Sequence, residues 1–530
     1  MNCRRLNILV LCVMALIPCV AMAQSARESL MQLQKLNRFY RYLETMYVDS
    51  VAMAPLVESA MRSMLSELDP HSTYLDIEEM NASRESIEGE FSGIGIEYNI
   101  HNDSIMVVNT VARGPAESVG LLPNDRIVVI DGENVVGIKR NDVAPKLRGP
   151  KGSVVKVGVA RHGVDSLIDF SITRDNIPIT TVDAAYIADK GVGYIKVNRF
   201  ASTTMREFRD AMQSLGDIDA LILDLCGNSG GLLNQAVEMA GYFLPPQALV
   251  VYTEGRAIKP EYYRAAEGGD FDGSVVVLID GSSASASEIV SGALQDWDRG
   301  VVVGTTSFGK GLVQRQIPMG DGSAVRLTVA RYHTPTGRAI QRPYEKGQKE
   351  QYYKDYVNRM TGQQTDSLHE ERPAFETIQL QRKVYGNGGI EPDIVVESDT
   401  TEVSDYLVKV VARGVYADYM MDYMDANREK LDAQYPTFEL FEQGFRLSDG
   451  DLQAFVDKAT KMGVEFDSEG FERSKGLICD QLTAMIAQRL FSTSEFYRVM
   501  NPRQSEYYKK AMEVLSRRSA DGGIESMLKE

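Results

Sequence analysis

The sequence predicts a multidomain α/β protein whose two ends are helical. Strand-like and helix-like segments alternate from about Gly191, short β-branched strands begin at Phe91, and amphipathic helical patterns occupy both ends. A chain of 530 residues is also too long for one hydrophobic core. We therefore divide it into a leader (1–23), a helical region (24–88), a β-rich module (89–175), an α/β core with an insertion near 344–376 (176–400) and a helical C-terminal region (401–530).

The composition is that of an ordinary globular protein with a net negative charge. Hydrophobic residues make up 44% of the chain, charged residues make up 25%, and the formal net charge is −17. Non-specific nucleic-acid binding needs a basic surface, so we expect no nucleic-acid partner.

The first residues have the pattern of a secretory signal peptide. The positive stretch MNCRR precedes an uncharged apolar run, which ends in the small-x-small cleavage pattern Ala21-Met22-Ala23. We expect cleavage after this pattern and export, to the periplasm if the source has an outer membrane. An uncleaved membrane anchor is the first alternative. A lipoprotein modified at Cys19 is less favoured, because the two residues before it are not small.

Residues 26 to about 88 show helical spacing. Apolar residues recur three and four positions apart in SLMQLQKLNRFYRYLETMY, and PLVESAMRSMLSELD repeats the pattern. The dipeptide Asp69-Pro70 ends the second helix. We interpret His71, in the turn that follows, as a structural residue.

The β-rich module contains one short helical stretch, NDVAPKLRG, with Val143 and Leu147 on one face. Pro145 fits such a helix only in the first turn, where backbone N–H groups have no helical partner. Beyond the core, the chain past Glu402 is amphipathic and carries no chemistry-bearing motif. We expect this C-terminal region to serve in packing, or in contacts with a second copy of the chain or with an adaptor protein.

Four serines crowd the segment DGSSASASEIVSGALQD, where an apolar strand leads into a helix. A side chain at such a junction is exposed and lies beside free backbone N–H groups that can hold an oxyanion. Ser285 is therefore a candidate nucleophile, and Glu288 in the first turn suits the helix dipole. On this segment alone, a helix cap made by Ser285 or Ser287 is the favoured interpretation.

A serine nucleophile needs a base. The candidates are His333 in ARYHTPTG and Lys310 in TTSFGKGLVQRQ, the latter if burial keeps its amine neutral. Gln314 follows four residues later and is placed to orient the amine. In LILDLCGNSGGLL, Gly230 and Gly231 let the backbone approach closely and donate N–H groups, and a plain strand–helix turn is the alternative.

Metal and disulfide chemistry have little support in the sequence. The histidines are scattered and no CxxC motif occurs. Only Cys226 and Cys479 lie outside the leader, and they are far apart in the chain. We therefore expect no metal, no other cofactor and no disulfide.

Several motifs of the core together resemble those of the C-terminal processing (tail-specific) peptidases. They are LILDLCGNSGGLL, SASASEIVSGALQD, GTTSFGKGLVQ, LTVARYHTPTGRAIQ and GGIEPDI. LDPHSTYL and FSGIGIEY match the N-terminal part of this family, so the resemblance covers roughly Ser29 to Glu397. It implies a serine endopeptidase on an α/β core of the ββα-spiral type, without a metal or other cofactor.

The resemblance also implies roles for individual residues. Ser285 corresponds to the nucleophile, Lys310 to the general base of a serine–lysine dyad, and Gln314 to the residue that positions the lysine. The oxyanion donors correspond to the backbone N–H groups of Gly231 and Ala286.

A PDZ module from Phe91 to about Arg174 is a further implication of the resemblance. PDZ domains hold the C-terminus of a substrate as an added strand, with its carboxylate on the N–H groups of a Gly-rich loop. SGIGIE supplies this loop, and nearby apolar side chains form a pocket, so we expect protein or peptide substrates with apolar C-termini. The expected tail-binding residues are Gly93, Ile94, Gly95, Ile96, Val143 and Leu147.

Three positions depart from the family pattern. Asn124 stands at a turn position where the family usually has Gly, a mild departure because Asn tolerates left-handed backbone geometry. The family commonly has Arg where Cys226 stands and often Pro where Ser229 stands. We interpret Cys226 as a small packing residue, and the departure leaves the dyad intact. The alternative functions are a PDZ scaffold on an inactive peptidase fold and a serine–histidine hydrolase that uses His333.

Overall fold

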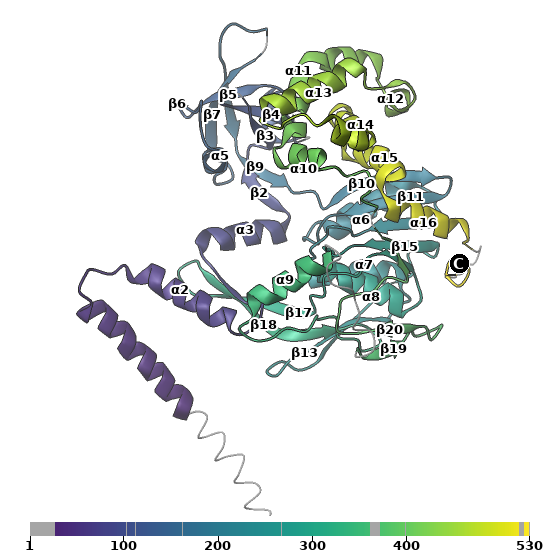
Figure 1. Cartoon of the computed structure of the whole chain (residues 1–530). Coiled ribbons are helices and arrows are strands. Elements are labelled where there is room, and N and C mark those ends of the chain that lie inside the picture. Colours follow the sequence, from purple (N-terminus) through teal and green to yellow (C-terminus); the bar gives the residue numbers. More distant parts are fainter. Residues whose placement is uncertain are drawn as a thin grey trace, which may run out of the picture.

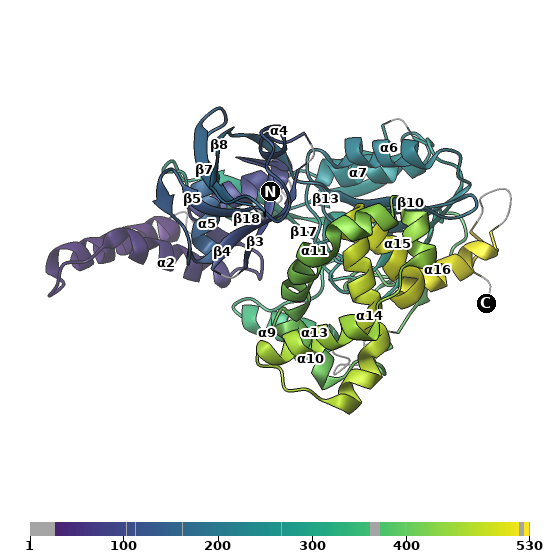
Figure 2. The same ribbon diagram turned by 90° about the horizontal axis from the view of Figure 1, so that it is seen from above.

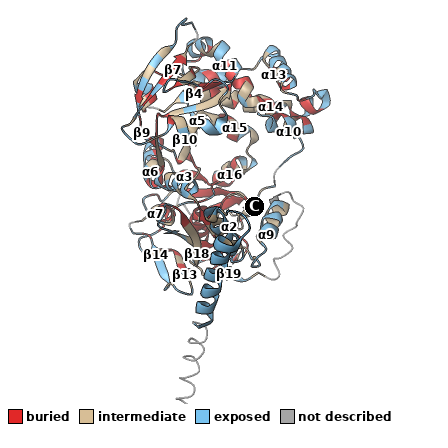
Figure 3. Ribbon diagram, turned by 90° about the vertical axis from the view of Figure 1, so that its left-hand side faces the viewer, coloured by how far each residue is buried: buried red, intermediate tan, exposed pale blue. Residues whose placement is uncertain are grey.

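The computed structural model describes residues 27–518, except 102, 112, 162, 267, 361–371 and 398, together with 524–528. The predicted leader lies outside the described residues. Figure 1 shows a helix that projects from the body at the N-terminal end, a β-rich module, an α/β core, and C-terminal helices that lie against both. Buried residues concentrate in the core, whereas the projecting helix is exposed (Figure 3). The predicted α/β architecture with helical ends is confirmed.

The N-terminal region is helical and ends in a strand that joins the core. Its elements are a helix over 27–46, α2 (Met53–Ser66), β1 (Thr73–Leu75) and α3 (Ile77–Glu88). α3 begins with a capping box, in which Asp76 and Glu79 exchange side-chain-to-backbone hydrogen bonds. β1 pairs antiparallel with β18 (Ala324–His333), with Tyr74 opposite Val325. The turn between α2 and β1 is thereby fixed against the core.

The β-rich module has a mainly antiparallel sheet in the order β3-β4-β5-β7-β8, so that β3 is an edge strand. β2 and β9, the first and last strands of the module, pair with each other in a separate two-stranded ladder. Pro145 lies in the second half of α5 rather than in the first turn, and the helix ends two residues later. The elements are β2 (Glu90–Gly93), β3 (Ile96–His101), β4 (Ser104–Thr110), α4 (Pro115–Ser118), β5 (Arg126–Ile130), β6 (Glu133–Asn134), α5 (Arg140–Leu147), β7 (Val154–Ala160), β8 (Ile168–Thr173) and β9 (Asp175–Pro178).

The core is built on a six-stranded sheet in the order β10-β11-β12-β15-β16-β21, parallel except for β10. Its central strands are apolar and buried on both faces, as parallel strands require. The elements are β10 (Val182–Asp189), β11 (Val192–Val197), α6 (Thr204–Leu215), β12 (Ala220–Asp224), α7 (Leu233–Phe243), β15 (Ser274–Ile279), α8 (Ala286–Asp296), β16 (Val301–Gly304) and β21 (Ile394–Val395).

A second sheet packs beside the first and brings distant segments together. Its order is β1-β18-β13-β14, and β17 also pairs with β18. The predicted insertion near 344–376 contains α9 and β19, and β19 pairs with β20, which lies just beyond the predicted bounds. The elements are β13 (Leu249–Glu254), β14 (Glu261–Arg264), β17 (Leu312–Pro318), α9 (Lys349–Met360), β19 (Ala374–Glu376) and β20 (Lys383–Tyr385).

The C-terminal helices form their own core and also cover the main sheet. α6, α7 and α8 pack on one face of the sheet, and the last two helices contribute to the hydrophobic cluster on the other (Figure 2). Within the part of the chain that is described, no helix is both long and apolar enough to cross a bilayer. The elements are α10 (Asp405–Ala412), α11 (Val415–Gln434), α12 (Phe438–Gly444), α13 (Asp449–Lys461), α14 (Ser468–Leu490), α15 (Thr493–Gln504) and α16 (Glu506–Ser516).

A substitution of Tyr508 tests how much the packing of α16 on the main sheet contributes to stability. The Tyr508 ring is 6% exposed and lies edge-on to buried Tyr194, with 5.8 Å between ring centroids. Tyr508→Ala should lower the free energy of unfolding by about 3–5 kcal/mol, because it removes a large buried aromatic ring. Denaturant unfolding checks this value. The exposed neighbour substitution Lys509→Ala should change it little, and equal effects of both would show that α16 does not stabilise the sheet.

Candidate active site

Ser285 stands at the junction between a core strand and a helix. β15 ends at Ile279 and α8 begins at Ala286, so Ser285 is the N-terminal cap residue of α8. Its φ of 56° and ψ of −110° are unusual for a residue with a side chain. Such strain persists only where the surroundings enforce it, and it concentrates at functional sites. The backbone geometry therefore favours a role for Ser285 beyond that of a helix cap.

The neighbouring serines have structural partners. Ser283 Oγ donates to the Leu225 carbonyl at 2.9 Å, and Ser287 Oγ donates to the Asn228 carbonyl at 2.9 Å. Through these two hydrogen bonds, the turn at Ser285 is connected to the loop that follows β12. Ser287 is thus a buried anchor rather than a helix cap.

Glu288 connects this turn to the loop that carries Lys310. Its Oε2 accepts hydrogen bonds from the backbone N–H groups of Ser285 at 2.7 Å and Lys310 at 3.0 Å. Its Oε1 accepts from Ser307 Oγ at 2.6 Å and from the Gly309 N–H at 2.7 Å. Burial raises the pKa of this carboxyl group, and the four hydrogen bonds oppose that effect. The sequence suggested only a helix-dipole role, because three of the four donors come from the segment 307–310, which is distant in the chain.

Lys310 has the environment that a neutral amine requires. It is partly buried between Gly309 and Gly311, and Tyr332 donates its hydroxyl group to the Lys310 carbonyl. Burial lowers the pKa of the Lys310 amine, and the positive charge of Arg326 lowers it further. Glu288 and Asp69 act in the opposite direction. The net effect is a lowered pKa, so the amine loses its proton more readily than that of an exposed lysine.

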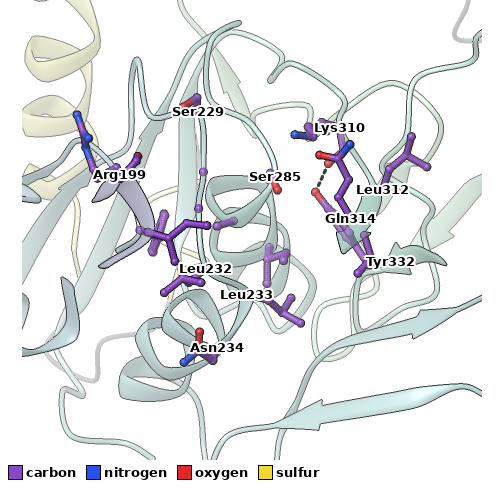
Figure 4. Close-up of a pocket in the computed structure, with 18 of the residues that line it drawn as sticks. Arg199, Ser229, Leu232, Leu233, Asn234, Ser285, Lys310, Leu312, Gln314 and Tyr332 are labelled. Carbon is purple, nitrogen blue, oxygen red and sulfur yellow. Dashed lines mark hydrogen bonds between the residues drawn. The ribbon is translucent and has the colours of Figure 1, made fainter. Parts of the chain in front are cut away.

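Ser285 and Lys310 line the same cavity, which has a volume of about 1080 Å³. Figure 4 shows Ser285 between the loop of Ser229 on one side and Lys310 on the other. Gln314 and Tyr332 lie on the Lys310 side. The structure thus brings together the five residues predicted for the catalytic machinery, namely Ser285, Lys310, Gln314, Gly231 and Ala286.

Gln314 makes a contact that the sequence did not suggest. Its Nε2 donates to the backbone carbonyl of His71 at 2.7 Å. The backbone N–H of His71 donates to Asp69 Oδ1, and Asp69 also accepts from Thr328 Oγ1. Burial and the nearby Lys310 lower the pKa of the His71 imidazole to about 4. The N-terminal turn is therefore structural, as predicted, and is also part of the surroundings of the dyad.

Two backbone N–H groups at the cavity are free to bind an oxyanion. Among hydrogen bonds of the described residues, none uses the N–H of Gly231 or of Ala286 as donor. The N–H of Gly230, by contrast, donates to Asn228 Oδ1 at 2.8 Å. A Cβ on Gly230 would lie 2.8 Å from the Ser285 Cβ and 2.9 Å from the Ala286 nitrogen. Gly230 therefore permits close approach, and Gly231 offers the donor.

A buried ion pair holds the start of this oxyanion loop. Lys196 Nζ lies 2.9 Å from Asp224 Oδ1 and also donates to the Cys226 carbonyl. Asp224 Oδ1 accepts from the Cys226 N–H at 2.8 Å, and Tyr194 donates to its other oxygen at 2.6 Å. Burial raises the pKa of the Cys226 thiol well above its ordinary value. Cys226 and Cys479 are both free thiols.

The predicted tail-binding residues lie at one edge of the β-rich module. Gly93 ends β2, Gly95 has a φ of 75°, and Ile96 opens the edge strand β3. Ile94, Val143 and Leu147 are buried together in the core of the module, and Ile96 packs against them. In this structure the side chains of Ile94, Val143 and Leu147 fill the core of the module, and Ile96 is partly exposed at its edge.

His333 lies outside the Ser285 cavity. Its ring stacks on Tyr252, with 4.8 Å between centroids, and its Nε2 is 3.4 Å from Glu254 Oε1. This position argues against the serine–histidine alternative.

Comparison with known proteins agrees with this geometry. Family models match peptidase family S41 over residues 191–347, a PDZ domain over 106–161, the N-terminal domain of the activating protease CtpB over 18–79, and a family of unknown function over 406–492. The carboxy-terminal-processing protease of Bartonella bacilliformis is 38% identical over 335 residues, which cover 61% of this chain and 76% of the relative. The chain belongs to the carboxy-terminal processing protease family.

Other relatives of this family extend the comparison. The carboxy-terminal processing protease CtpB of Bacillus subtilis is 37% identical over 332 residues, covering 62% of this chain and 68% of the relative. The solved photosystem II D1 C-terminal processing protease is 30% identical, covers 57% of this chain and 82% of its own, and has a TM-score of 0.34. Membership confirms the predicted family, the PDZ module and the S41 peptidase core, and it supports a serine protease function.

A substitution of Glu288 tests the connection between the Ser285 turn and the Lys310 loop. Glu288→Gln replaces one acceptor oxygen by an NH2 group that faces N–H donors, so it should reduce kcat at least about 10-fold and lower the free energy of unfolding by about 1–3 kcal/mol. Peptide hydrolysis and denaturant unfolding measure the two effects. Glu261→Gln, at an exposed strand position, is the matched control. Wild-type kcat in Glu288→Gln would contradict this role.

Proposed function

We propose that this protein is an exported serine endopeptidase that cleaves proteins selected by their C-terminal tails, with Ser285 and Lys310 as the catalytic dyad. The observation that carries the proposal is the shared cavity, which is lined by a serine with a strained backbone and by a lysine whose pKa is lowered by burial. Ser285 is the nucleophile, Lys310 the general base, and Gln314 the residue that positions the lysine loop.

The chemistry follows from these positions. Neutral Lys310 takes the hydroxyl proton of Ser285 while the serine oxygen attacks the peptide carbonyl carbon. The N–H groups of Gly231 and Ala286 bind the negative oxygen that forms. The Lys310 ammonium then gives its proton to the departing amine, and water hydrolyses the acyl-enzyme. None of these steps requires a metal or another cofactor.

Substrate selection belongs to the PDZ module. An extended substrate tail would add as a strand to the free edge of β3, with its carboxylate on the N–H groups of the Gly93–Gly95 loop. The apolar surface of β3 and α5 favours an apolar C-terminal residue. Contacts with a second copy or an adaptor through the C-terminal helices belong to the same proposal.

Cleavage of an unfolded reporter protein with an apolar C-terminal tail tests the dyad. Ser285→Ala and Lys310→Ala should each reduce kcat/KM by about 1000-fold or more, since removal of one member disables the unit. His333→Ala should retain activity. A reporter that ends in a charged residue should be cleaved more slowly by the wild type.

Two results would count against the proposal. Cleavage that survives Lys310→Ala would exclude lysine as the base. Tail binding without cleavage by the wild type would favour a PDZ scaffold on an inactive fold.

The pH dependence gives a second test of the base. Lys310 must be neutral to act, so kcat/KM should rise with pH through a limb that lies below the ordinary lysine pKa of 10.5. Arg326→Gln removes a neighbouring positive charge and should move this limb to higher pH. Arg331→Gln, at an exposed position of the same strand, is the control. A limb that Arg326→Gln leaves in place would contradict the assignment of the limb to Lys310.

A further inference from the structure

The Ser285 cavity is lined by basic and not by acidic side chains. Arg199, Lys310 and Arg326 contribute to the lining, and no aspartate or glutamate does so among the residues that the structure describes. The whole chain has a formal net charge of −17, so the cavity has the opposite sign to the molecule. A cleft lined by one sign of charge attracts ligands of the other sign, because its low-dielectric walls focus the field.

Neither arginine is paired with a carboxylate. Among the described residues, no aspartate or glutamate forms an ion pair with Arg199 or Arg326. The hydrogen bonds that they make are to neutral groups: Arg199 Nε donates to Asn198 Oδ1 at 3.1 Å, and Arg326 Nη2 donates to Ser83 Oγ at 2.7 Å. A guanidinium group has five N–H donors, so most of this capacity is unused.

The burial of Arg326 makes its lack of a carboxylate partner informative. Burial lowers the pKa of its guanidinium group, and only the charge of Glu79 opposes this effect. A partly buried cation without a counter-ion costs free energy, so most such groups in folded proteins are paired. Glu79 already binds Arg62 at 2.8 Å. Arg326 therefore remains available to an anion that enters the cavity.

The two arginines lie on opposite sides of the nucleophile. Arg199 precedes Phe200, whose backbone pairs with the Gly231 loop, and Figure 4 shows Arg199 on the far side of Ser229 from Lys310. Arg326 belongs to β18, and its charge acts on Lys310. An extended peptide that passes Ser285 would therefore run between Arg199 on the side of the Gly231 loop and Arg326 on the side of Lys310.

We propose that Arg199 and Arg326 are specificity-determining residues that select substrates with a carboxylate close to the scissile bond. The carboxylate belongs to an aspartate or glutamate side chain of the substrate, or to its C-terminus when the cut lies near the end. Both arginines have terminal N–H groups free for a charge-assisted, bidentate hydrogen bond with such a group. This inference rests on the proposed function, and it adds a second selection step to tail recognition by the PDZ module.

Matched reporters test the inference. One unfolded sequence carries glutamate or glutamine at each position within three residues of the cut, and a second pair has a free or an amidated C-terminus. For the wild type, kcat/KM should be at least about 10-fold higher for glutamate at one or more positions. At a pH above the limb of Lys310, Arg326→Gln or Arg199→Gln should bring that ratio close to one. The ratio cancels effects on the base that all substrates share.

Binding separates this inference from the proposed function. Ser285→Ala cannot turn over but keeps the cavity, so fluorescence anisotropy with the same peptides should show tighter binding of the glutamate or free-carboxylate forms. Addition of Arg326→Gln should abolish the difference, and addition of Arg331→Gln should not. Equal binding and equal kcat/KM for charged and neutral forms would overturn the inference. Failure of the wild type to cleave any reporter would overturn the proposed function alone.

Discussion

The hydrogen bonds of one buried carboxylate, that of Glu288, set the geometry of the whole active site. The same oxygen accepts from the backbone of Ser285 and of Lys310, so the two loops are held at a separation that a single atom determines. A carboxylate without hydrogen bonds would be too costly to bury here. Its four donors converge only when α8, the strand before it and the Lys310 loop are all in place. The relative placement of the Ser285 and Lys310 loops is therefore a consequence of the folded core and not of local sequence.

The oxyanion loop depends on a second buried charge, and here the C-terminal helices contribute. The Lys196–Asp224 pair holds both the N–H and the carbonyl of Cys226. Tyr194 completes the hydrogen bonds of Asp224 and packs against Tyr508 of α16. Buried ion pairs stabilise only when their remaining polar atoms are satisfied and water is excluded. The C-terminal helices thus help to exclude water from the Lys196–Asp224 pair. None of their described residues lines the Ser285 cavity.

The PDZ module contacts both α3 and the C-terminal helix α11. Its two ends pair with each other in the β2–β9 ladder. This two-stranded ladder joins the module to the rest of the chain and lies beside α3. At the far end of β3, His101 lies 3.5 Å from Asp418 and 3.1 Å from Asp422 on α11. A tail that adds to β3 would bind along a strand whose end is already held by the C-terminal helices. The Ser285 cavity is lined in part by α3, and no described residue of β3 or α5 contributes to its lining.

The sequence by itself determined the order of the regions, the strand–turn–helix setting of Ser285 and the family motifs, because these are properties of short contiguous segments. The placement of Lys310, Gln314 and Gly231 around one cavity was predictable only through the family resemblance, since they lie on different strands and loops. Tertiary structure alone decided the partners of Glu288, the contact of Gln314 with His71 and the unpaired arginines of the cavity. The Glu288 contact with Lys310 spans 22 positions of the chain and the Gln314 contact with His71 spans 243, and Arg326 donates to Ser83 across 243 positions without forming an ion pair. Periodicity and local motifs carry no information about contacts between residues that are distant in the chain, because burial and hydrogen bonding are decided by the packing of the whole core.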